Sequence, residues 1–295
     1  MPITFRPPAE AAELALARMK EDGLVHPDAY FNADAADGLR EEVAPRDPYF
    51  TYRLGRTPLE TEIVDGALEL LKAEGLVPAS ADYYRAAVDA HRSMLKDTFE
   101  GAWTTLSPTM ERLMFMLTSV RRPMHLLELG SFWGYTLAWF AGPCVGPSRI
   151  YEPERIIGID RDEKMTARAR ENFAKLANAE RVELIAEDAR TALDRVDGPF
   201  DFVYLEAKFE NRQIAKAEEE GDDSPLAPVR GLYLILLKQL YDRLSDDAWV
   251  IAHDNLDWTA VKNMRPYLEF VRDKAHFSES ICFDIDDCGL ELSIR

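Results

Sequence analysis

The chain has 295 residues, 47% of them hydrophobic, which is enough for one large α/β domain with an appendage or for two modest domains. It carries 53 acidic and 35 basic side chains, a formal charge of −18, and this excess repels a nucleic-acid backbone or an anionic membrane surface. We therefore expect no nucleic-acid partner, and we ascribe the negative charge to solubility.

The cysteines and the apolar stretches indicate where the protein resides. Cys144, Cys282 and Cys288 are too few and too irregularly spaced for a disulfide framework or a zinc knuckle, which favours a reducing compartment. The first residues lack the basic and apolar regions of a signal peptide. The most apolar stretch, HLLELGSFWGYTLAWFAG, contains Glu128 and three glycines, and it predicts a strand, a turn and a helix. We expect a cytoplasmic protein with no membrane partner.

Residues 1–104 show helical periodicity and no convincing β pattern, so we expect a helical N-terminal extension or cap. The clearest helical segments are 59–76 and 81–100. Core padding, a homodimer interface and a substrate lid are all compatible with this extension, and we favour padding or dimerisation over a part in the chemistry.

From Pro108 to the C-terminus, short apolar runs alternate with amphipathic helices, which is typical of a parallel sheet with flanking helices. We assign residues 105–295 to this domain. Two β-rich stretches near the end are compatible with an antiparallel pair at the sheet edge. The acidic segment 215–228 has the composition of a long mobile loop. The predicted strands are 124–129, 155–160, 181–186, 200–206, 248–253, 277–285 and 289–295, and the predicted helices include 108–120, 136–142, 162–177, 189–196, 229–244 and 263–275.

The sharpest motif is LLELGSFWGYT, a strand that ends in Glu128 and runs through Gly130 and Gly134 into a helix. Glycines let the backbone turn tightly and approach a cofactor closely. The spacing E-x-G-x-x-x-G is not the dinucleotide fingerprint, and a carboxylate at this position would repel a pyrophosphate. It suits a cationic ligand with amino and hydroxyl donors, such as S-adenosylmethionine. By itself, the pattern is equally compatible with a purely structural turn.

Acidic residues also follow the next two predicted strands. Asp160 could accept both hydroxyls of a ribose, and Asp188 could accept from an adenine amino group. The alternative for each acid is a helix N-cap, especially for Asp162 and Asp188. Three acids at successive strand ends favour a ligand, because ligands in such sheets lie outside the carboxyl ends of the strands.

These residues belong to a longer resemblance. Residues from about 105 to 295 resemble the metal-dependent small-molecule O-methyltransferases typified by the catechol and caffeoyl-CoA enzymes. The resemblance implies a Rossmann-like class I methyltransferase sheet, S-adenosylmethionine as cofactor and a small-molecule substrate. The segments that carry it are LSPTMERLM, ELGSFWGYT, GIDRDEKMTARARENF, AEDA, FDFVYLEA, AWVIAHDN and DDCGLELSIR, and the cofactor residues that it implies are Glu128, Gly130, Ser131, Gly134, Thr136, Asp160, Asp188 and Ala189.

The same resemblance implies a divalent metal ion held by Glu206, Asp254 and Asn255. Two carboxylates and an amide oxygen are hard ligands that suit Mg²⁺ or a similar ion. Such an ion would acidify a substrate hydroxyl, for example of a phenol or catechol, and orient it for methylation. The alternative is that Asp254 and Asn255 only shape the turn after their strand.

Two positions depart from the family pattern. Glu206 stands where the family has Asp, and the place of the family's lysine base is taken by Phe209, with Lys208 as the nearest lysine. His253 is a second candidate base by its chemistry. The departures keep other hypotheses open: N- or C-methylation, cyclisation of the cofactor's own side chain, or a catalytically silent binding protein.

Overall fold

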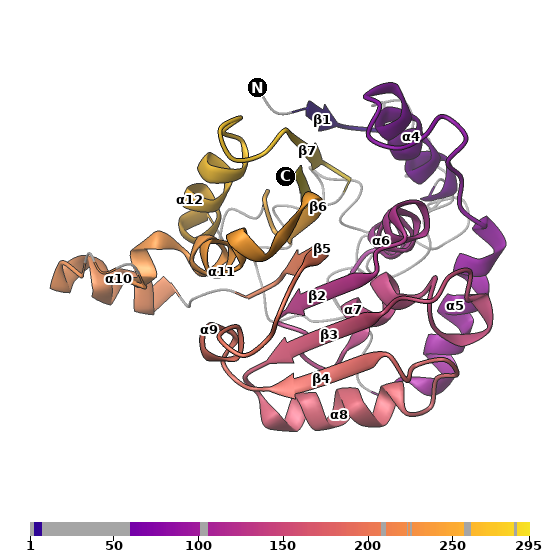
Figure 1. Cartoon of the computed structure of the whole chain (residues 1–295), viewed down its shortest axis with the longest axis horizontal. Helices are drawn as coiled ribbons and strands as arrows, with labels where there is room; N and C mark the ends of the chain where they lie inside the picture. Colours follow the sequence, from indigo (N-terminus) through magenta and orange to yellow (C-terminus); the bar gives the residue numbers. More distant parts are fainter. Residues whose placement is uncertain are drawn as a thin grey trace, which may run out of the picture.

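The computed structural model describes residues 3–7, 60–100, 106–207, 211–222, 224, 226–256, 261–285 and 288–295. Within these residues an eight-stranded sheet has the order β1-β7-β8-β6-β5-β2-β3-β4 (Figure 1). Neighbouring strands are parallel except around β8, which is antiparallel to both β6 and β7. The strands are β1 Ile3–Phe5, β2 His125–Leu129, β3 Arg155–Asp160, β4 Val182–Ala186, β5 Phe200–Leu205, β6 Leu244–His253, β7 Glu279–Phe283 and β8 Leu290–Ile294.

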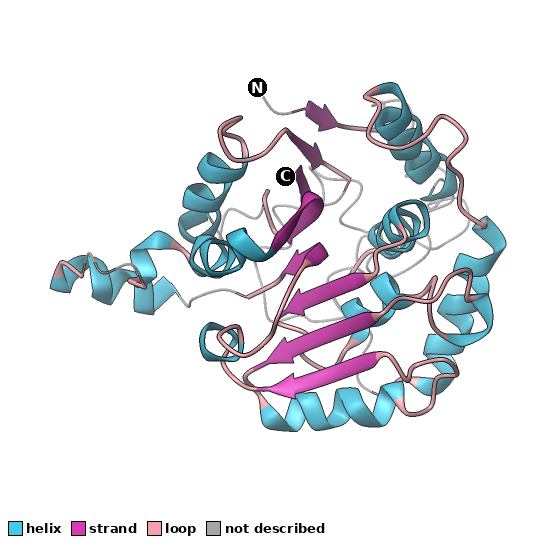
Figure 2. Ribbon diagram, in the orientation of Figure 1, coloured by secondary structure: helices cyan, strands magenta, loops and turns pink. Residues whose placement is uncertain are grey.

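Helices cover both faces of the sheet, so the domain has three layers (Figure 2). One core joins a sheet face to α4 through α8, and a second core joins the other face to α9, α11 and α12. This is the Rossmann-like arrangement that the alternating pattern predicts. The helices are α4 Glu60–Ala73, α5 Arg85–Thr98, α6 Pro108–Arg121, α7 Tyr135–Ala141, α8 Glu163–Phe173, α9 Ala189–Ala192, α10 Asn211–Glu220, α11 Leu232–Leu240 and α12 Val261–Val271, with 3-10 turns η2 Gly146–Ser148, η3 Pro228–Arg230 and η4 Tyr241–Arg243.

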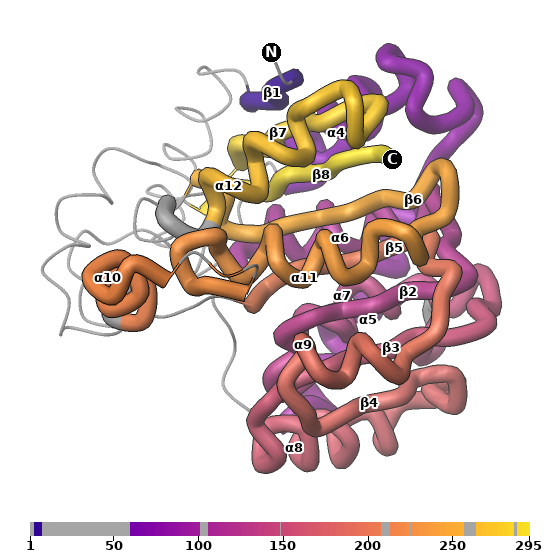
Figure 3. Tube along the Cα trace, turned by 60° about the vertical axis from the view of Figure 1, so that its left-hand side comes forward, coloured from indigo at the N-terminus to yellow at the C-terminus, as the bar shows by residue number. Residues whose placement is uncertain are grey.

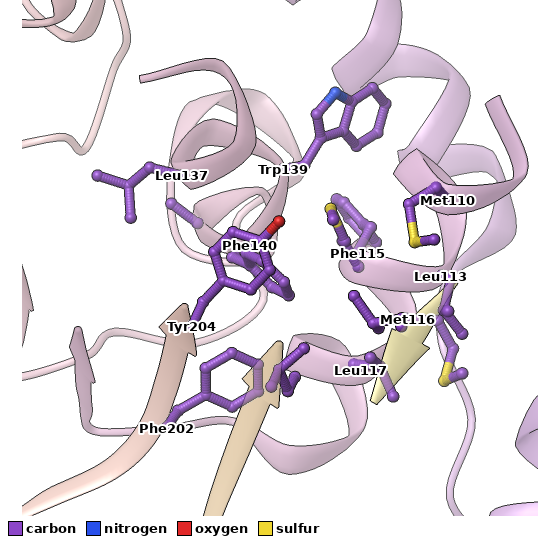
Figure 4. Close-up of a cluster of buried hydrophobic side chains, with 14 of the residues drawn as sticks. Met110, Leu113, Phe115, Met116, Leu117, Leu137, Trp139, Phe140, Phe202 and Tyr204 are labelled. Carbon is purple, nitrogen blue, oxygen red and sulfur yellow. The ribbon is translucent and has the colours of Figure 1, made fainter. Parts of the chain in front are cut away.

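Alternation along the central strands builds both cores. Leu126 of β2 belongs to one core and Leu127 to the other, because successive side chains on a strand point to opposite faces. Helix α6 begins at Pro108 after Ser107, whose hydroxyl accepts from the Met110 amide at 3.1 Å, a typical N-cap. Figure 4 shows side chains of α6 and α7 packed with Phe202 and Tyr204 of β5. The turn between β2 and α7 therefore stands on a closely packed base.

The structure differs from the sequence expectations in three places. The segment before Pro108 contributes a strand: Ile3–Phe5 pairs in parallel with β7 and forms the edge of the sheet (Figure 3). The β7–β8 pair is antiparallel as predicted, but it lies inside that edge. Residues 211–220, part of which was expected to form a mobile loop, form helix α10, because Ile214 packs against Ile235 of α11.

The helices before Pro108 are joined to the rest of the structure by packing and by buried charges. Side chains of α4 and α5 belong to the same core as α6 and α7. Arg92 of α5 donates to Glu60 of α4 at 2.9 Å and to Glu111 of α6 at 2.8 Å. Glu111 also accepts from Tyr135, at the start of α7, at 2.7 Å. Among the described residues, no helix is both long and apolar enough to cross a membrane.

Candidate active site

A cavity of about 370 Å³ opens at the carboxyl ends of the central strands. This is the edge where parallel α/β sheets bind ligands. The cavity walls come from the turn after β2 and from the ends of β3, β4, β5 and β6. Of the predicted residues, its lining contains Gly130, Ser131, Thr136, Asp160, Asp188 and Ala189, together with Glu206 and His253.

The turn after β2 needs its two glycines. Gly130 has a φ of +98°, and a Cβ atom there would lie 2.7 Å from the carbonyl oxygen of Glu206. Gly134 has a φ of +84°, and a Cβ atom there would lie 2.8 Å from the ring of Phe173 in α8. Only glycine accepts both the left-handed backbone and these approaches. The turn thus places its backbone at the wall of the cavity, as the motif predicts.

Glu128 lies fully buried at the end of β2. Neither of its carboxylate oxygens has a hydrogen-bond partner among the described residues. Burial raises the pKa of Glu128 well above its ordinary value, and the nearby carboxylates of Glu206 and Asp160 raise it further. A buried polar group without a partner is costly, which makes this carboxyl a candidate for interaction with a bound ligand.

Asp160, at the end of β3, lines the cavity and is held by the backbone. Its Oδ2 accepts from the Phe132 amide and its Oδ1 from the Asp162 amide, each at 2.8 Å. The first bond fixes the turn after β2 to the end of β3. Asp160 is therefore oriented before any ligand binds, and each oxygen keeps capacity to accept from a ligand hydroxyl.

The N-cap alternative is confirmed for two other acids. Asp162 caps α8, accepting from the amides of Lys164 and Met165 at 2.9 and 3.1 Å. Asp188 caps α9 and pairs with the guanidinium of Arg190, at 2.7 Å to Oδ2. The hydrogen bond with Arg190 lowers the pKa of Asp188. Asp188 reaches the cavity, but with its carboxylate already engaged.

The predicted metal residues Glu206 and Asp254 meet at one histidine. Nδ1 of His253 lies 2.8 Å from Oε2 of Glu206 and 3.7 Å from Oδ1 of Asp254. The Tyr204 hydroxyl also donates to Oε2 of Glu206, at 2.7 Å. Burial lowers the pKa of His253, but the two carboxylates outweigh it and hold that pKa well above 6.5.

Asn255 is held by a different set of side chains. Its amide nitrogen donates to Oε2 of the buried Glu291 at 2.8 Å and lies 3.2 Å from Sγ of Cys282. Arg272 neutralises Glu291 with two bonds, at 2.7 and 2.8 Å. The amide oxygen of Asn255 is buried without a hydrogen-bond partner in the described structure, next to Gly289. That oxygen is the one atom Asn255 could offer an ion.

The remaining predicted residue, Lys208, lies outside the described residues.

Sequence reasoning missed several groups that the structure places at the site. Tyr204 could have been found, because it stands two residues before Glu206 on β5 and so shares its face. Glu291 and Cys288 gave no such signal, since their neighbours Asn255 and His253 lie more than thirty residues away in the chain.

Comparisons with known proteins agree with this geometry. Residues 126–220 match the profile of a methyltransferase domain family. The O-methyltransferase ankF of Aspergillus thermomutatus is 28% identical over 120 residues, which is 40% of this chain and 48% of that protein. The match thus spans about half the length of that relative.

Two solved structures are similar to this chain. The methyltransferase PaMTH1 of Podospora anserina, bound to SAH, is 19% identical, covers 81% of this chain and 97% of its own, and superposes with a TM-score of 0.50. TomG of Streptomyces achromogenes, an O-methyltransferase of tomaymycin synthesis in complex with SAM, is 17% identical over 77% of this chain and 95% of its own, with a TM-score of 0.46.

The fold is that of the class I S-adenosylmethionine-dependent methyltransferases, as predicted from the sequence. The segment that matches the methyltransferase domain profile, residues 126–220, contains the turn after β2 and the ends of β3, β4 and β5.

Proposed function

We propose that the protein transfers the methyl group of S-adenosylmethionine to an oxygen atom of a small molecule. The observation that carries the proposal is Glu128, a fully buried carboxyl without a hydrogen-bond partner among the described residues, close to a cavity lined by six of the eight predicted cofactor residues. A cofactor with an ammonium group supplies the positive donors that Glu128 lacks. A nucleotide diphosphate would instead bring negative charge toward Glu128, Asp160 and Glu206.

Each wall of the cavity has a part in this proposal. The ammonium group of the cofactor would lie toward Glu128, and the ribose hydroxyls would donate to Asp160. The turn from Gly130 to Thr136 would pass beneath the cofactor, and Asp188 and Ala189 would border the adenine. Methyl transfer by direct in-line displacement needs positioning above all, and a rigid turn on a packed base supplies it.

We further propose that a divalent ion assists the reaction beside this cavity. The predicted ligands offer a compatible donor set: Glu206 and Asp254 converge, and the amide oxygen of Asn255 is buried without a hydrogen-bond partner among the described groups. When bound, the ion would acidify a substrate hydroxyl and orient it. His253, which lines the cavity, and Lys208 are the proposed bases.

Incubation with methyl-labelled S-adenosylmethionine and a panel of catechols and phenols tests the reaction. Label in an O-methylated acceptor is the expected result. Label on nitrogen or carbon, or in a product of the cofactor alone, would replace O-methylation by another use of the same cofactor. Binding without turnover on any acceptor would point to a silent binding protein.

Thermal melting tests the ion separately from turnover. An ion that binds only the native state stabilises it by about 2.7 kcal/mol at a hundredfold excess over its dissociation constant. A divalent ion should therefore raise the melting temperature, EDTA should lower it, and Asp254→Ala should abolish the response, while Glu206→Asp should keep it. If neither EDTA nor added metal changes melting or turnover, the metal-assisted mechanism is wrong.

A further inference from the structure

A second set of side-chain atoms that could bind a metal ion lies next to the cavity. One ligand atom each from His253, Asp254 and Cys288 lie within 4.8 Å of one another, and all three residues are buried. His253 and Asp254 stand at the end of β6, and Cys288 stands just before β8. The antiparallel register pairs His253 with Leu290, which brings the two segments together.

The backbone fixes this arrangement without any ion. Asp254 has a φ of +63°, a left-handed conformation that turns the chain sharply after β6. Its amide donates to the carbonyl oxygen of Gly289 at 3.1 Å, and the Leu256 amide donates to that of Cys288 at 2.9 Å. Asp254 and Cys288 are thus held close together by main-chain bonds, so the loss of one side chain would leave the others in place.

The two nitrogens of His253 are in different situations. Nδ1 hydrogen-bonds to Glu206 at 2.8 Å, whereas Nε2 is buried and bonds to no oxygen or nitrogen atom of the described residues. The ring also interacts with the side chain of Cys288. Metal-bound histidines typically donate one ring nitrogen to a carboxylate, which sets the tautomer and orients the other nitrogen toward the metal. Glu206 occupies the position of such an orienting carboxylate.

We propose that His253 Nε2, Asp254 and Cys288 bind Zn²⁺ or a similar borderline divalent ion, with Glu206 orienting His253. Imidazole, thiolate and carboxylate are zinc ligands, whereas Mg²⁺ prefers oxygen alone. Three protein ligands leave a fourth position for a substrate oxygen, as in catalytic zinc sites. The inference rests on the metal-assisted part of the proposed function. It replaces Asn255 and Glu206 as direct ligands, and it makes His253 a ligand in place of a base.

Cobalt substitution tests this donor set directly. The full-length protein is dialysed against EDTA, freed of chelator and titrated with Co²⁺, which gives a thiolate-to-cobalt charge-transfer band when a cysteine binds it. We expect the band to saturate at one ion per chain, to disappear when Zn²⁺ is added, and to persist in excess Mg²⁺. If the folded protein binds Co²⁺ without a thiolate band, or if Mg²⁺ displaces it equally well, the proposed ligands are wrong.

Matched variants separate the two ligand sets. Cys288→Ala should abolish the band, whereas Cys144→Ala, which removes another buried cysteine, should retain it. Asn255→Ala should also retain it, and Glu206→Gln should weaken Zn²⁺ binding about 10- to 100-fold, as expected for an orienting group. A band that survives in Cys288→Ala, or that vanishes in Asn255→Ala with folding intact, overturns the proposal.

Calorimetry with S-adenosylmethionine on the same samples keeps the two conclusions apart. A protein that binds the cofactor but gives no thiolate band retains its proposed methyltransferase function and lacks this zinc site. A protein that shows the band but binds no cofactor has the metal site without the proposed function. Cofactor binding by Cys288→Ala also shows that this variant is folded, so loss of its band reports the ligand itself.

Discussion

The two halves of the cavity are built in different ways. At the ends of β2 and β3, backbone conformation makes the site: a glycine turn at φ +98° and backbone amides that hold Asp160. At the ends of β5 and β6, side chains make it: Glu206, His253 and Asp254 meet around one imidazole nitrogen. The first half comes from two consecutive strands and their turns, within residues 128–162, whereas the second depends on contacts between segments farther apart in the chain.

The largest expected effect is a loss of stability where the turn after β2 contacts the backbone of Glu206. Gly130→Ala places a methyl group against the carbonyl oxygen of Glu206, so clash and left-handed strain together should cost about 3 kcal/mol of unfolding free energy. Gly75→Ala is the matched control, because Gly75 has a φ of +72° but nothing within 4 Å of the added atom. Denaturant unfolding should show a loss of about 1 kcal/mol there. Equal losses at both positions would mean that the approach to Glu206 is unimportant.

A second prediction concerns the pH dependence of stability at Glu128. Its pKa in the folded protein lies well above 4.5, so its contribution to stability is complete below about pH 4.5 and is lost as pH rises toward that higher value. Glu128→Gln removes this loss. Without cofactor, the melting temperature of the variant should exceed that of the wild type by about 3 °C near pH 7, and the gap should close toward pH 4.5. A gap that widens on acidification would contradict the assignment.

Asp160 and Asp162 offer a smaller and cleaner contrast within the first half. Asp160→Ala should weaken cofactor binding about tenfold, because the ribose hydroxyls lose a charged acceptor. Asp162→Ala removes the cap of α8 and should lower stability by about 1 kcal/mol while leaving affinity unchanged. Calorimetry and melting on both variants check the pair, and equal affinities for Asp160→Ala and the wild type would remove Asp160 from the site.

The smallest effect is expected at Asp188. Asparagine keeps the N-cap hydrogen bond of α9 but loses the charge that pairs with Arg190, an ion pair that is partly exposed. Asp188→Asn should therefore change stability by no more than about 0.5 kcal/mol. An affinity loss of several-fold in calorimetry would support contact with the adenine amino group, whereas unchanged affinity would leave Asp188 as a helix cap alone.

The sequence predicted most of the fold because apolar runs and helical periods are local signals. It missed β1, since three residues such as Ile3–Phe5 carry no pattern and their pairing with β7 is distant. It also missed α10, because the acidic composition of this segment is typical of a loop and does not reveal that Ile214 packs against Ile235. At the site, the positions of Gly130 and Asp160 beside the cavity could be predicted, because both belong to local motifs at strand ends. The spacing of the cysteines excluded a zinc knuckle, but it could not show that Cys288 meets His253 across two strands.

Proton release on cofactor binding tests the central claim most directly. The raised pKa of Glu128 favours its protonated form before the cofactor binds, and an ammonium group should favour its charged form. Titration of S-adenosylmethionine in buffers of different ionisation enthalpy, near pH 7, should therefore show release approaching one proton per site in the wild type. Glu128→Gln should bind at least about tenfold more weakly and release none. Equal affinity and equal proton exchange in the two proteins would contradict the placement of the cofactor.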